Sequence, residues 1–539
     1  MRNKFFTIVI ILFCALINAQ AQSTMPRLVK NGNTTQLLVD NKPFLILGGE
    51  LGNSSASSNE YMRPIWPKLK QMNLNTVIAP VYWEIMEPVE GKFVFSLLDT
   101  LIKNARLFNM KLVLLWFGAW KNSMSCYAPA WVKTNTTRFP RILDKRGSQQ
   151  EIMTPFNKNN LEADKKAFVR LMQYIRETDN KEHTVITVQV ENEIGMLPDA
   201  RTYDEAANAA FNKAVPEQLL NYLKKNKNDL LPEIKSIWEA NGSKTSGTWE
   251  DVFGKSLSTD EIFMAWYYAV FANELTMAAK AVYNVPMYVN AALNRPGAKP
   301  GQYPSAGPLP HVMDIWKAAA TSVDFLAPDF YNPDFKHWCD LYTKAGDPLF
   351  IPEHRFEKGI DAKAFFAFGN YKCLAFSPFS IESTNEPGKE PIGKAYNILN
   401  QLTPLITKYQ STGAVKGFLI EKDSIQKDIP IGDYLFTVHH EYKMGWSAGA
   451  KDSSWPLAGG LIIAVAPDEF YVAGTGIVMT FTPKTNNKKA GFISVDEGNF
   501  ENGVWKPGRR MNGDQDHQGR HVRIPANDYS IQHVKLYTY

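Results

Sequence analysis

The sequence predicts an α/β protein in which a (β/α)8 TIM barrel is followed by an all-β sandwich domain. From about residue 44, short apolar segments alternate with longer amphipathic ones, the pattern expected of repeated βα units around a parallel sheet. Eight such apolar segments follow one another, the number that a closed barrel requires. From about residue 415 the pattern changes to short alternating strands separated by Gly-rich and Asn-Gly breaks, which is typical of a sandwich.

The first 21 residues are expected to be a secretory signal peptide and not part of this fold. Arg2 and Lys4 precede a short apolar run, FFTIVIILFCALI, and AQA at 19–21 has the small residues of a cleavage site. The run is too short for a comfortable membrane span. We therefore expect an exported protein without a membrane span, periplasmic or extracellular, whose mature chain begins at Gln22.

The barrel and its additions are expected to occupy residues 22–413. A hairpin at 27–44 precedes the first strand, and a single helix with an apolar face from Met62 to Met72 links the first two strands. The stretch from about 200 to 282 is too long for one crossover helix and predicts a helical insertion that builds one rim of the site. Residues 414–539 form the predicted β-sandwich. The eight barrel strands are expected at 43–50, 76–83, 112–118, 185–192, 286–293, 323–331, 348–353 and 372–382.

Charge and cysteine content argue against several classes of protein. The formal charge is +5 and becomes +3 once the two positive residues Arg2 and Lys4 are removed, and no dense basic run remains, so nucleic acid is not an expected partner. Three cysteines remain after cleavage, Cys126, Cys339 and Cys373, without metal-ligand spacing. We expect neither a metal nor a cofactor, and the oligomeric state is not predicted.

Two carboxylates stand at the ends of predicted barrel strands. The fourth strand, TVITVQV, runs into Glu191, Asn192 and Glu193, and the seventh, PLFIPE, ends at Glu353. Because active-site groups of such barrels come from the carboxyl ends of the strands, Glu193 and Glu353 could face one cavity. Glycoside hydrolysis needs such a pair: one protonated carboxyl that donates to the leaving oxygen, and one carboxylate that attacks the sugar.

The motifs around these residues resemble those of glycoside hydrolase family 35, a family of the larger clan of retaining (β/α)8 enzymes. QVENEIG at 189–195 is similar to the acid/base signature of that family, YWEIMEPVEGKFVFS at 82–96 to its strand-two segment, and GGE at 48–50 to its strand-one Gly-Gly pair. The resemblance covers about residues 40–410. It is nearest to bacterial members that have a small C-terminal β domain.

The resemblance implies roles for individual residues. Glu193 is the acid/base, Glu353 is the nucleophile, Asn192 binds the sugar 2-hydroxyl and Tyr331 contacts the nucleophile. Two positions depart from the family pattern: Ile194 replaces a tyrosine, and the third strand lacks a glutamate that holds the sugar in many relatives. The residues expected to take that substrate-binding task are Glu50, Lys121 and Asn122, with Trp120 as an aromatic platform.

These observations predict a retaining exo-β-galactosidase that removes terminal β-galactosyl residues from an oligosaccharide or polysaccharide, with the two carboxyl groups about 5 to 5.5 Å apart. One alternative keeps the mechanism and changes the sugar, giving a β-glucosidase or a β-glucuronidase-like enzyme of the same clan. Another is a noncatalytic carbohydrate-binding protein. In a third alternative the C-terminal domain binds glycans independently, although we expect this domain to pack against the barrel.

Overall fold

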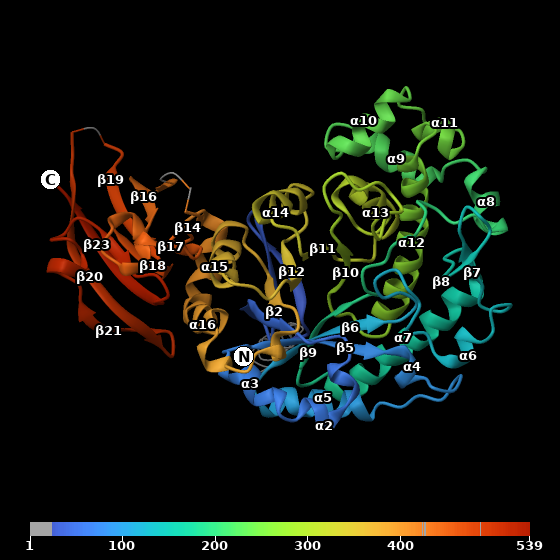
Figure 1. Ribbon diagram of the computed structural model, residues 1–539, viewed down its shortest axis with the longest axis horizontal. Coiled ribbons are helices and arrows are strands. Elements are labelled where there is room, and N and C mark those ends of the chain that lie inside the picture. The colour runs from blue at the N-terminus through green and yellow to red at the C-terminus, as the bar shows by residue number, and fades with distance from the viewer. Residues whose placement is uncertain (1–23, 423, 425–426, 486) are drawn as a thin grey trace, which may run out of the picture.

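The computed structural model describes residues 24–539 except 423, 425, 426 and 486 (Figure 1). The predicted signal peptide therefore lies outside the described residues. Within the described chain, eight parallel strands close into a barrel in chain order, and β-sheets form the C-terminal part, so the predicted fold class is confirmed. The barrel strands are β4 (Ile46–Glu50), β5 (Thr76–Tyr82), β6 (Lys111–Phe117), β9 (Val185–Gln189), β10 (Met287–Ala292), β11 (Phe325–Phe330), β12 (Phe350–His354) and β13 (Ala375–Pro378).

All eight predicted barrel strands are found, and only their ends differ from prediction. They are apolar on both faces because side chains pack inside the barrel on one face and against the helices on the other, and each of β5, β9 and β12 is buried along its whole length. The register aligns Asp329 of β11 with Glu353 of β12. The parallel arrangement thus brings the carboxyl ends of all the strands to one end of the barrel.

Helices surround the barrel and follow the amphipathic segments. The predicted single helix between the first two strands is instead two, α2 (Asn59–Met62) and α3 (Ile65–Gln71), with Pro64 between them. Pro64 has no amide hydrogen for a helical hydrogen bond, which explains the interruption. The other surrounding helices are α4 (Trp83–Met86), α5 (Ser96–Leu107), α6 (Ala130–Lys133), α7 (Lys158–Asp179), α13 (Met313–Ala319), α14 (Phe335–Lys344), α15 (Ile360–Asn370) and α16 (Pro391–Tyr409).

Between β9 and β10 the chain forms a group of helices that rises beside one side of the barrel (Figure 1). The longest, α12, is apolar all round and mostly buried, and it packs against α7 and α13. Its Tyr268 hydroxyl donates to the carbonyl of Gly195, 3.1 Å away, so the helix supports the segment after β9. These helices are α8 (Glu205–Phe211), α9 (Glu217–Lys225), α10 (Pro232–Ala240), α11 (Trp249–Phe253) and α12 (Leu257–Lys280).

Two small sheets accompany the barrel. The predicted N-terminal hairpin is extended by a third strand into an antiparallel sheet of β1 (Arg27–Asn31), β2 (Thr34–Val39) and β3 (Lys42–Phe44). Its Gln36 amide donates to the carbonyl of Thr407 at 2.6 Å, which ties the sheet to α16. A short hairpin, β7 (Arg141–Leu143) with β8 (Gln149–Met153), lies between β6 and α7.

The C-terminal part contains two facing sheets with their own apolar core. Phe418, Phe436 and Val472 belong to this core and come from both sheets. One sheet has the order β14 (Val415–Ile420), β17 (Ala458–Ala466), β18 (Glu469–Thr475), β23 (Ser530–Thr538), β20 (Ala490–Glu501) and β21 (Val504–Arg510). The other has the order β15 (Lys427–Ile431), β16 (Tyr434–His440), β19 (Ile477–Pro483) and β22 (Val522–Ile524).

This β domain packs directly on the barrel helices α15 and α16 (Figure 1). A Cβ atom on Gly369 of α15 would lie 2.7 Å from the backbone of Gly417 in β14, so the two elements approach closely only because both residues are glycine. The Tyr529 hydroxyl donates to the Asp361 carboxyl at 2.6 Å across the same contact. Leu461, Ile463 and Tyr471 of the β domain join the core of the barrel.

Helices long and apolar enough to cross a bilayer were not found among the described residues.

Candidate active site

Four carboxyl groups gather at the carboxyl ends of the barrel strands. Glu50 ends β4, Glu193 follows β9, Asp329 lies near the end of β11 and Glu353 lies in β12. One oxygen each of Glu193, Asp329 and Glu353 lies within 4.8 Å of the others, and each of these side chains is at most 4% exposed. The two carboxylates predicted from the sequence therefore do meet, although 160 residues separate them along the chain.

The backbone after β9 turns sharply to present Glu193. Both Glu191 and Glu193 have positive φ angles, 61° and 45°, a conformation that side-chain-bearing residues adopt rarely and that is concentrated at functional sites. The loop after β6 supports this segment, because the amide groups of Asn122 and Ser123 donate to the carbonyl oxygens of Asn192 and Glu193 at 3.2 and 3.1 Å. The two segments thus hold each other in place.

The Glu193 side chain and backbone have partners from the loop after β6 and from β10. The Asn122 amide donates a hydrogen bond to its carboxylate, and the Glu193 backbone N–H donates to Asn290 Oδ1 at 2.9 Å. Asn290 in turn donates through Nδ2 to Asp329 Oδ2 at 2.6 Å. Asn290 therefore connects the backbone of Glu193 to a second carboxyl group that faces the Glu193 side chain.

Glu353 accepts a hydrogen bond from Tyr331, the contact that the family resemblance implies. The Tyr331 hydroxyl donates to Glu353 Oε1, and the Glu50 carboxyl shares a hydrogen bond with Glu353 from the other side. Two carboxyl groups can share a hydrogen bond only if one carries the proton. Burial and repulsion by Glu353 both raise the pKa of Glu50 well above its ordinary value, so Glu50 holds that proton.

Burial raises the pKa of every carboxyl group in this cluster. For Glu353, burial followed by repulsion from Glu193 raises the pKa to about 7, while the hydrogen bonds from Tyr331 and Glu50 act in the opposite direction. Burial also raises the pKa of Glu193, against the effects of Lys121 and of the hydrogen bond from Asp329. Burial therefore favours the protonated form of both carboxyl groups, and their mutual repulsion opposes the ionisation of both at once.

Lys121 supplies the positive charge of this cluster. Its side chain is 5% exposed, and its ammonium lies 5.3 Å from the centre of the Phe117 ring. The charge lowers the pKa of Glu50, Glu193 and Glu353, because an ammonium nearby stabilises each ionised carboxylate. This places Lys121, as predicted, beside the groups that would surround a sugar.

Asn192 is the polar side chain with the clearest unmet bonding capacity. It is fully buried, and among the described residues neither its amide nitrogen nor its oxygen has a hydrogen-bond partner. A buried amide without a partner costs free energy, about 1 to 3 kcal/mol, which a ligand hydroxyl would recover. The arrangement fits the predicted contact of Asn192 with a sugar hydroxyl.

Glu191, two residues before Glu193, contacts a different carboxyl group. It lies fully buried beside Asp164 of α7, with which it shares a hydrogen bond, and it accepts the N–H of Trp120 at 2.7 Å. Asp164 accepts from Trp116 Nε1 at 2.8 Å and from the N–H of Ala119 at 3.2 Å. Burial and then Asp164 raise the pKa of Glu191 well above its ordinary value, so the pair shares a proton.

The structure does not bring the Trp120 ring into the carboxyl cluster. The predicted aromatic platform is fully buried in the core, where its ring lies edge-on to Tyr268 and Phe271, with centres 5.1 and 4.5 Å away. Its Nε1 donates to the carbonyl of Met153 at 3.1 Å. Trp120 acts at the site through its backbone, which binds Glu191 and accepts the N–H of Asn192.

Sequence reasoning missed Asp329 and Asn290. Both interrupt strands that are otherwise apolar, MYVNAA and FLAPDF, and both are at most 1% exposed. A polar residue inside a buried strand requires a partner, and Asp329 is separated from Tyr331 by one residue, so a continuing strand would place both on one face. These two signals could have identified them.

The same three carboxyl groups, Glu193, Asp329 and Glu353, are close enough to share a cation. Calcium requires about six to eight oxygen ligands, and one oxygen from each of these residues does not supply that number. The ammonium of Lys121 and the raised pKa values of the cluster fit shared protons better than a metal ion.

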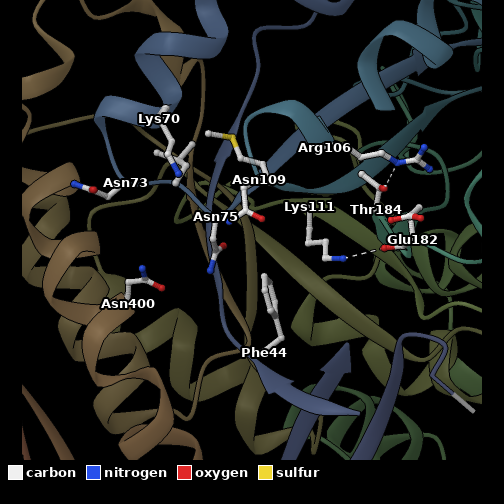
Figure 2. Close-up of a pocket in the computed structure, with 12 residues that line it drawn as sticks. Phe44, Lys70, Asn73, Asn75, Arg106, Asn109, Lys111, Glu182, Thr184 and Asn400 are labelled. Carbon is white, nitrogen blue, oxygen red and sulfur yellow. Dashed lines mark hydrogen bonds between the residues drawn. The ribbon is translucent and has the colours of Figure 1, made fainter. Parts of the chain in front are cut away.

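A separate cavity at the opposite end of the barrel has none of these features. It has a volume of about 430 Å³ and is lined by residues at or just before the amino ends of the strands, among them Asn75, Lys111 and Thr184 (Figure 2). Arg106 donates to the Thr184 hydroxyl at 2.9 Å, and Lys111 donates to the carbonyl of Glu182 at 3.1 Å. Contacts at this end of a barrel serve stability, so the carboxyl cluster is the candidate active site.

Family comparisons agree with a glycosidase barrel and find a match to a family other than the one whose motifs the sequence resembles. Residues 55–258 match the model of glycoside hydrolase family 42, described as beta-galactosidase. This match supports the predicted likeness to β-galactosidases, while family 35 itself is not shown. Residues 392–523 match a domain of unknown function, DUF5597. Curated protein sequences yield no match.

One solved structure shows the same fold at low sequence identity. The β-galactosidase of Bacillus circulans sp. alkalophilus is similar with a TM-score of 0.50 and 10% identity, over 91% of this chain and 99% of that one. Those of Marinomonas ef1 and Rahnella sp. R3 both have a TM-score of 0.45, with 12% and 14% identity over 67% of this chain. The chain spans only 60% and 57% of the lengths of these two.

Proposed function

We propose that this protein is an exported, retaining exo-β-galactosidase that acts on galactose-containing oligosaccharides or polysaccharides. The proposal rests above all on the close approach of Glu193 and Glu353, whose carboxyl oxygens lie within 4.8 Å. Retaining glycosidases hold their two carboxyl groups about 5 to 5.5 Å apart, whereas inverting enzymes leave about 6.5 to 9.5 Å for a water molecule. The observed approach supports the retaining arrangement.

In the proposed first step, Glu353 attacks the anomeric carbon while Glu193 gives its proton to the departing oxygen. The donors on Glu353, Tyr331 and Glu50, stabilise its ionised form. Glu193, whose pKa is raised by burial, keeps the proton that the leaving group needs. In the second step Glu193 removes a proton from water, which releases the sugar from Glu353 with net retention.

Galactose is the proposed sugar because the family model that matches the barrel is described as beta-galactosidase. Asn192 is proposed to bind the 2-hydroxyl, and Glu50, Lys121 and Asn122 to contact the remaining hydroxyls. The experiment compares 4-nitrophenyl β-glycosides of galactose, glucose and glucuronic acid, followed by proton NMR of the first sugar released. We expect β-galactose to appear first. Initial release of α-galactose would contradict retention, and activity on glucoside without activity on galactoside would contradict the sugar.

Export is proposed from the N-terminal sequence, in which Arg2 and Lys4 precede the apolar run and AQA ends at position 21. The test is N-terminal sequencing of the protein recovered from a bacterial host after separation of periplasm and cytoplasm. We expect a periplasmic chain that begins at Gln22. A full-length chain confined to the cytoplasm would contradict the proposal.

A further inference from the structure

A cavity opens beside the candidate active site, where the barrel meets the β domain. It has a volume of about 500 Å³, within the range of ligand pockets. The residues on the barrel side follow β11 and β12, so the cavity lies at the carboxyl ends of the strands, as the carboxyl cluster does. Its lining includes Tyr331, Lys336 and Arg355 from the barrel and Leu419, Glu421 and Leu457 from the β domain.

Tyr331 connects this cavity to the catalytic carboxylates. Its hydroxyl donates to Glu353, while its ring lines the cavity and the residue is 37% exposed. Arg355 lies on the same side, with its guanidinium 5.7 Å from the centre of the Tyr331 ring and Nη2 donating to the Tyr331 carbonyl at 3.2 Å. The cavity therefore begins one side chain away from the proposed nucleophile.

The chemistry of the lining suits an uncharged, hydroxyl-rich ligand. Leu419, Leu457 and Tyr331 provide apolar and aromatic groups in the lining, as needed against the C–H faces of sugar rings. Arg355 and Glu421 provide hydrogen-bonding groups from the two domains. Charges in the described lining balance, with three cations and three carboxylates, which favours no net charge on the ligand: Lys336, Arg355 and Lys363 against Asp334, Glu357 and Glu421.

We propose that this cavity binds the neutral oligosaccharide to which the cleaved galactosyl residue is attached, so that the β domain contributes to substrate recognition. The inference rests on the proposed glycosidase function and extends it to a part of the chain that matches only a domain of unknown function. It explains why the β domain packs closely on α15 and supplies residues beside the catalytic face.

Glu421→Gln tests the contribution of the β domain in the full-length protein. Activity is compared on 4-nitrophenyl β-galactoside, which has no further sugar, and on β-(1,4)-galactotetraose. We expect KM for the tetrasaccharide to rise about fivefold or more relative to KM for the aryl galactoside, because the charged acceptor of a sugar hydroxyl is replaced by a weaker neutral one. Arg355→Gln should act in the same direction. Glu501→Gln, an exposed carboxylate of the same domain outside the cavity, is the matched control.

A direct binding measurement separates this inference from the proposed function. Calorimetric titration of galactotetraose is carried out on Glu193→Gln protein with and without Glu421→Gln, and no turnover is required. Weaker binding of about fivefold or more in the double variant supports the cavity. Equal binding in both proteins, or equal changes for the aryl and tetrasaccharide substrates, overturns it. Absence of hydrolysis of every glycoside by the unaltered protein, together with binding that still depends on Glu421, would overturn the proposed function and leave the cavity as an oligosaccharide-binding site.

Discussion

Two buried pairs of carboxyl groups lie side by side in this molecule and differ in what surrounds them. Glu191 and Asp164 are bonded by Trp116 Nε1 and two backbone N–H groups, all of which belong to the protein. Glu193 and Glu353 instead face each other beside Asn192, an amide that has no partner among the described residues. The protein itself supplies the hydrogen-bond donors of the first pair, whereas the amide beside the second pair needs a ligand as its partner.

The comparison shows that burial and proximity do not by themselves identify a catalytic pair. Burial raises the pKa of both Glu191 and Glu193. Only the second pair has an unpartnered polar side chain among the described residues next to it, the amide of Asn192. The first pair joins α7 to the loop after β6, and a Cβ on Gly118 would lie 2.6 Å from Glu191 Oε1, so that pair is tightly enclosed.

The largest expected effect comes from Glu353→Gln. An amide cannot attack the anomeric carbon, so kcat should fall at least about 10⁴-fold. Activity is measured on 4-nitrophenyl β-galactoside, and the thermal midpoint should stay within a few degrees of that of the unaltered protein. Azide as an external nucleophile should restore turnover in a Glu353→Gly variant. An active Glu353→Gln protein would contradict the catalytic assignment.

Glu193→Gln should produce the next largest effect, and the effect should depend on the leaving group. Loss of a general acid costs about 10² to 10⁴ in rate. We expect the full loss with an alkyl galactoside and a much smaller loss in the first step with 2,4-dinitrophenyl galactoside, which needs no proton. An identical loss with both leaving groups would show that Glu193 is not the proton donor.

Matched substitutions at Glu191 test whether the pair of Glu191 and Asp164 serves stability and not catalysis. Glu191→Ala leaves the Trp120 N–H and Asp164 without their partner and should lower the free energy of unfolding by about 1 to 3 kcal/mol for each unsatisfied group. Glu191→Gln can still accept from Trp120 and donate to Asp164, so activity should remain within about tenfold of normal. Urea unfolding and galactoside hydrolysis measure the two effects. If Glu191→Gln lost as much activity as Glu193→Gln, both pairs would be needed for catalysis, which would contradict the distinction between them.

The smallest expected effect is on the pH dependence of stability. Because burial raises the pKa of Glu191 above 4.5 in the folded protein, the folded state binds more protons than the unfolded state at higher pH. Stability is therefore lost as pH rises above about 4.5 through the raised pKa, by up to about 1.4 kcal/mol per pH unit for this group. Glu191→Gln cannot ionise and should reduce that slope. Urea unfolding between pH 5 and 8 checks it, and an unchanged slope would contradict the protonated state.

Much of the fold could be predicted because it depends on local patterns. Periodicity and order along the chain predict the eight apolar strands and the change to short alternating strands near residue 415. They also place Glu193 and Glu353 at strand ends. The carboxyl pair could be inferred because parallel barrel strands bring their carboxyl ends together. The contact between Tyr331 and Glu353 was predicted from a family resemblance and is present in the structure.

Other features depend on which side chains meet across strands, and no local pattern specifies that. The sequence places Glu191 and Glu193 in nearly the same context, yet the positive φ angles after β9 turn one toward Asp164 and the other toward Asp329. Trp120 contacts Asn192 through its backbone carbonyl, and its ring lies in the core. The sequence alone therefore determined the barrel and the two strand-end carboxylates. Only the tertiary structure decided which acids share protons and how the β domain borders the site, because those contacts join residues far apart in the chain.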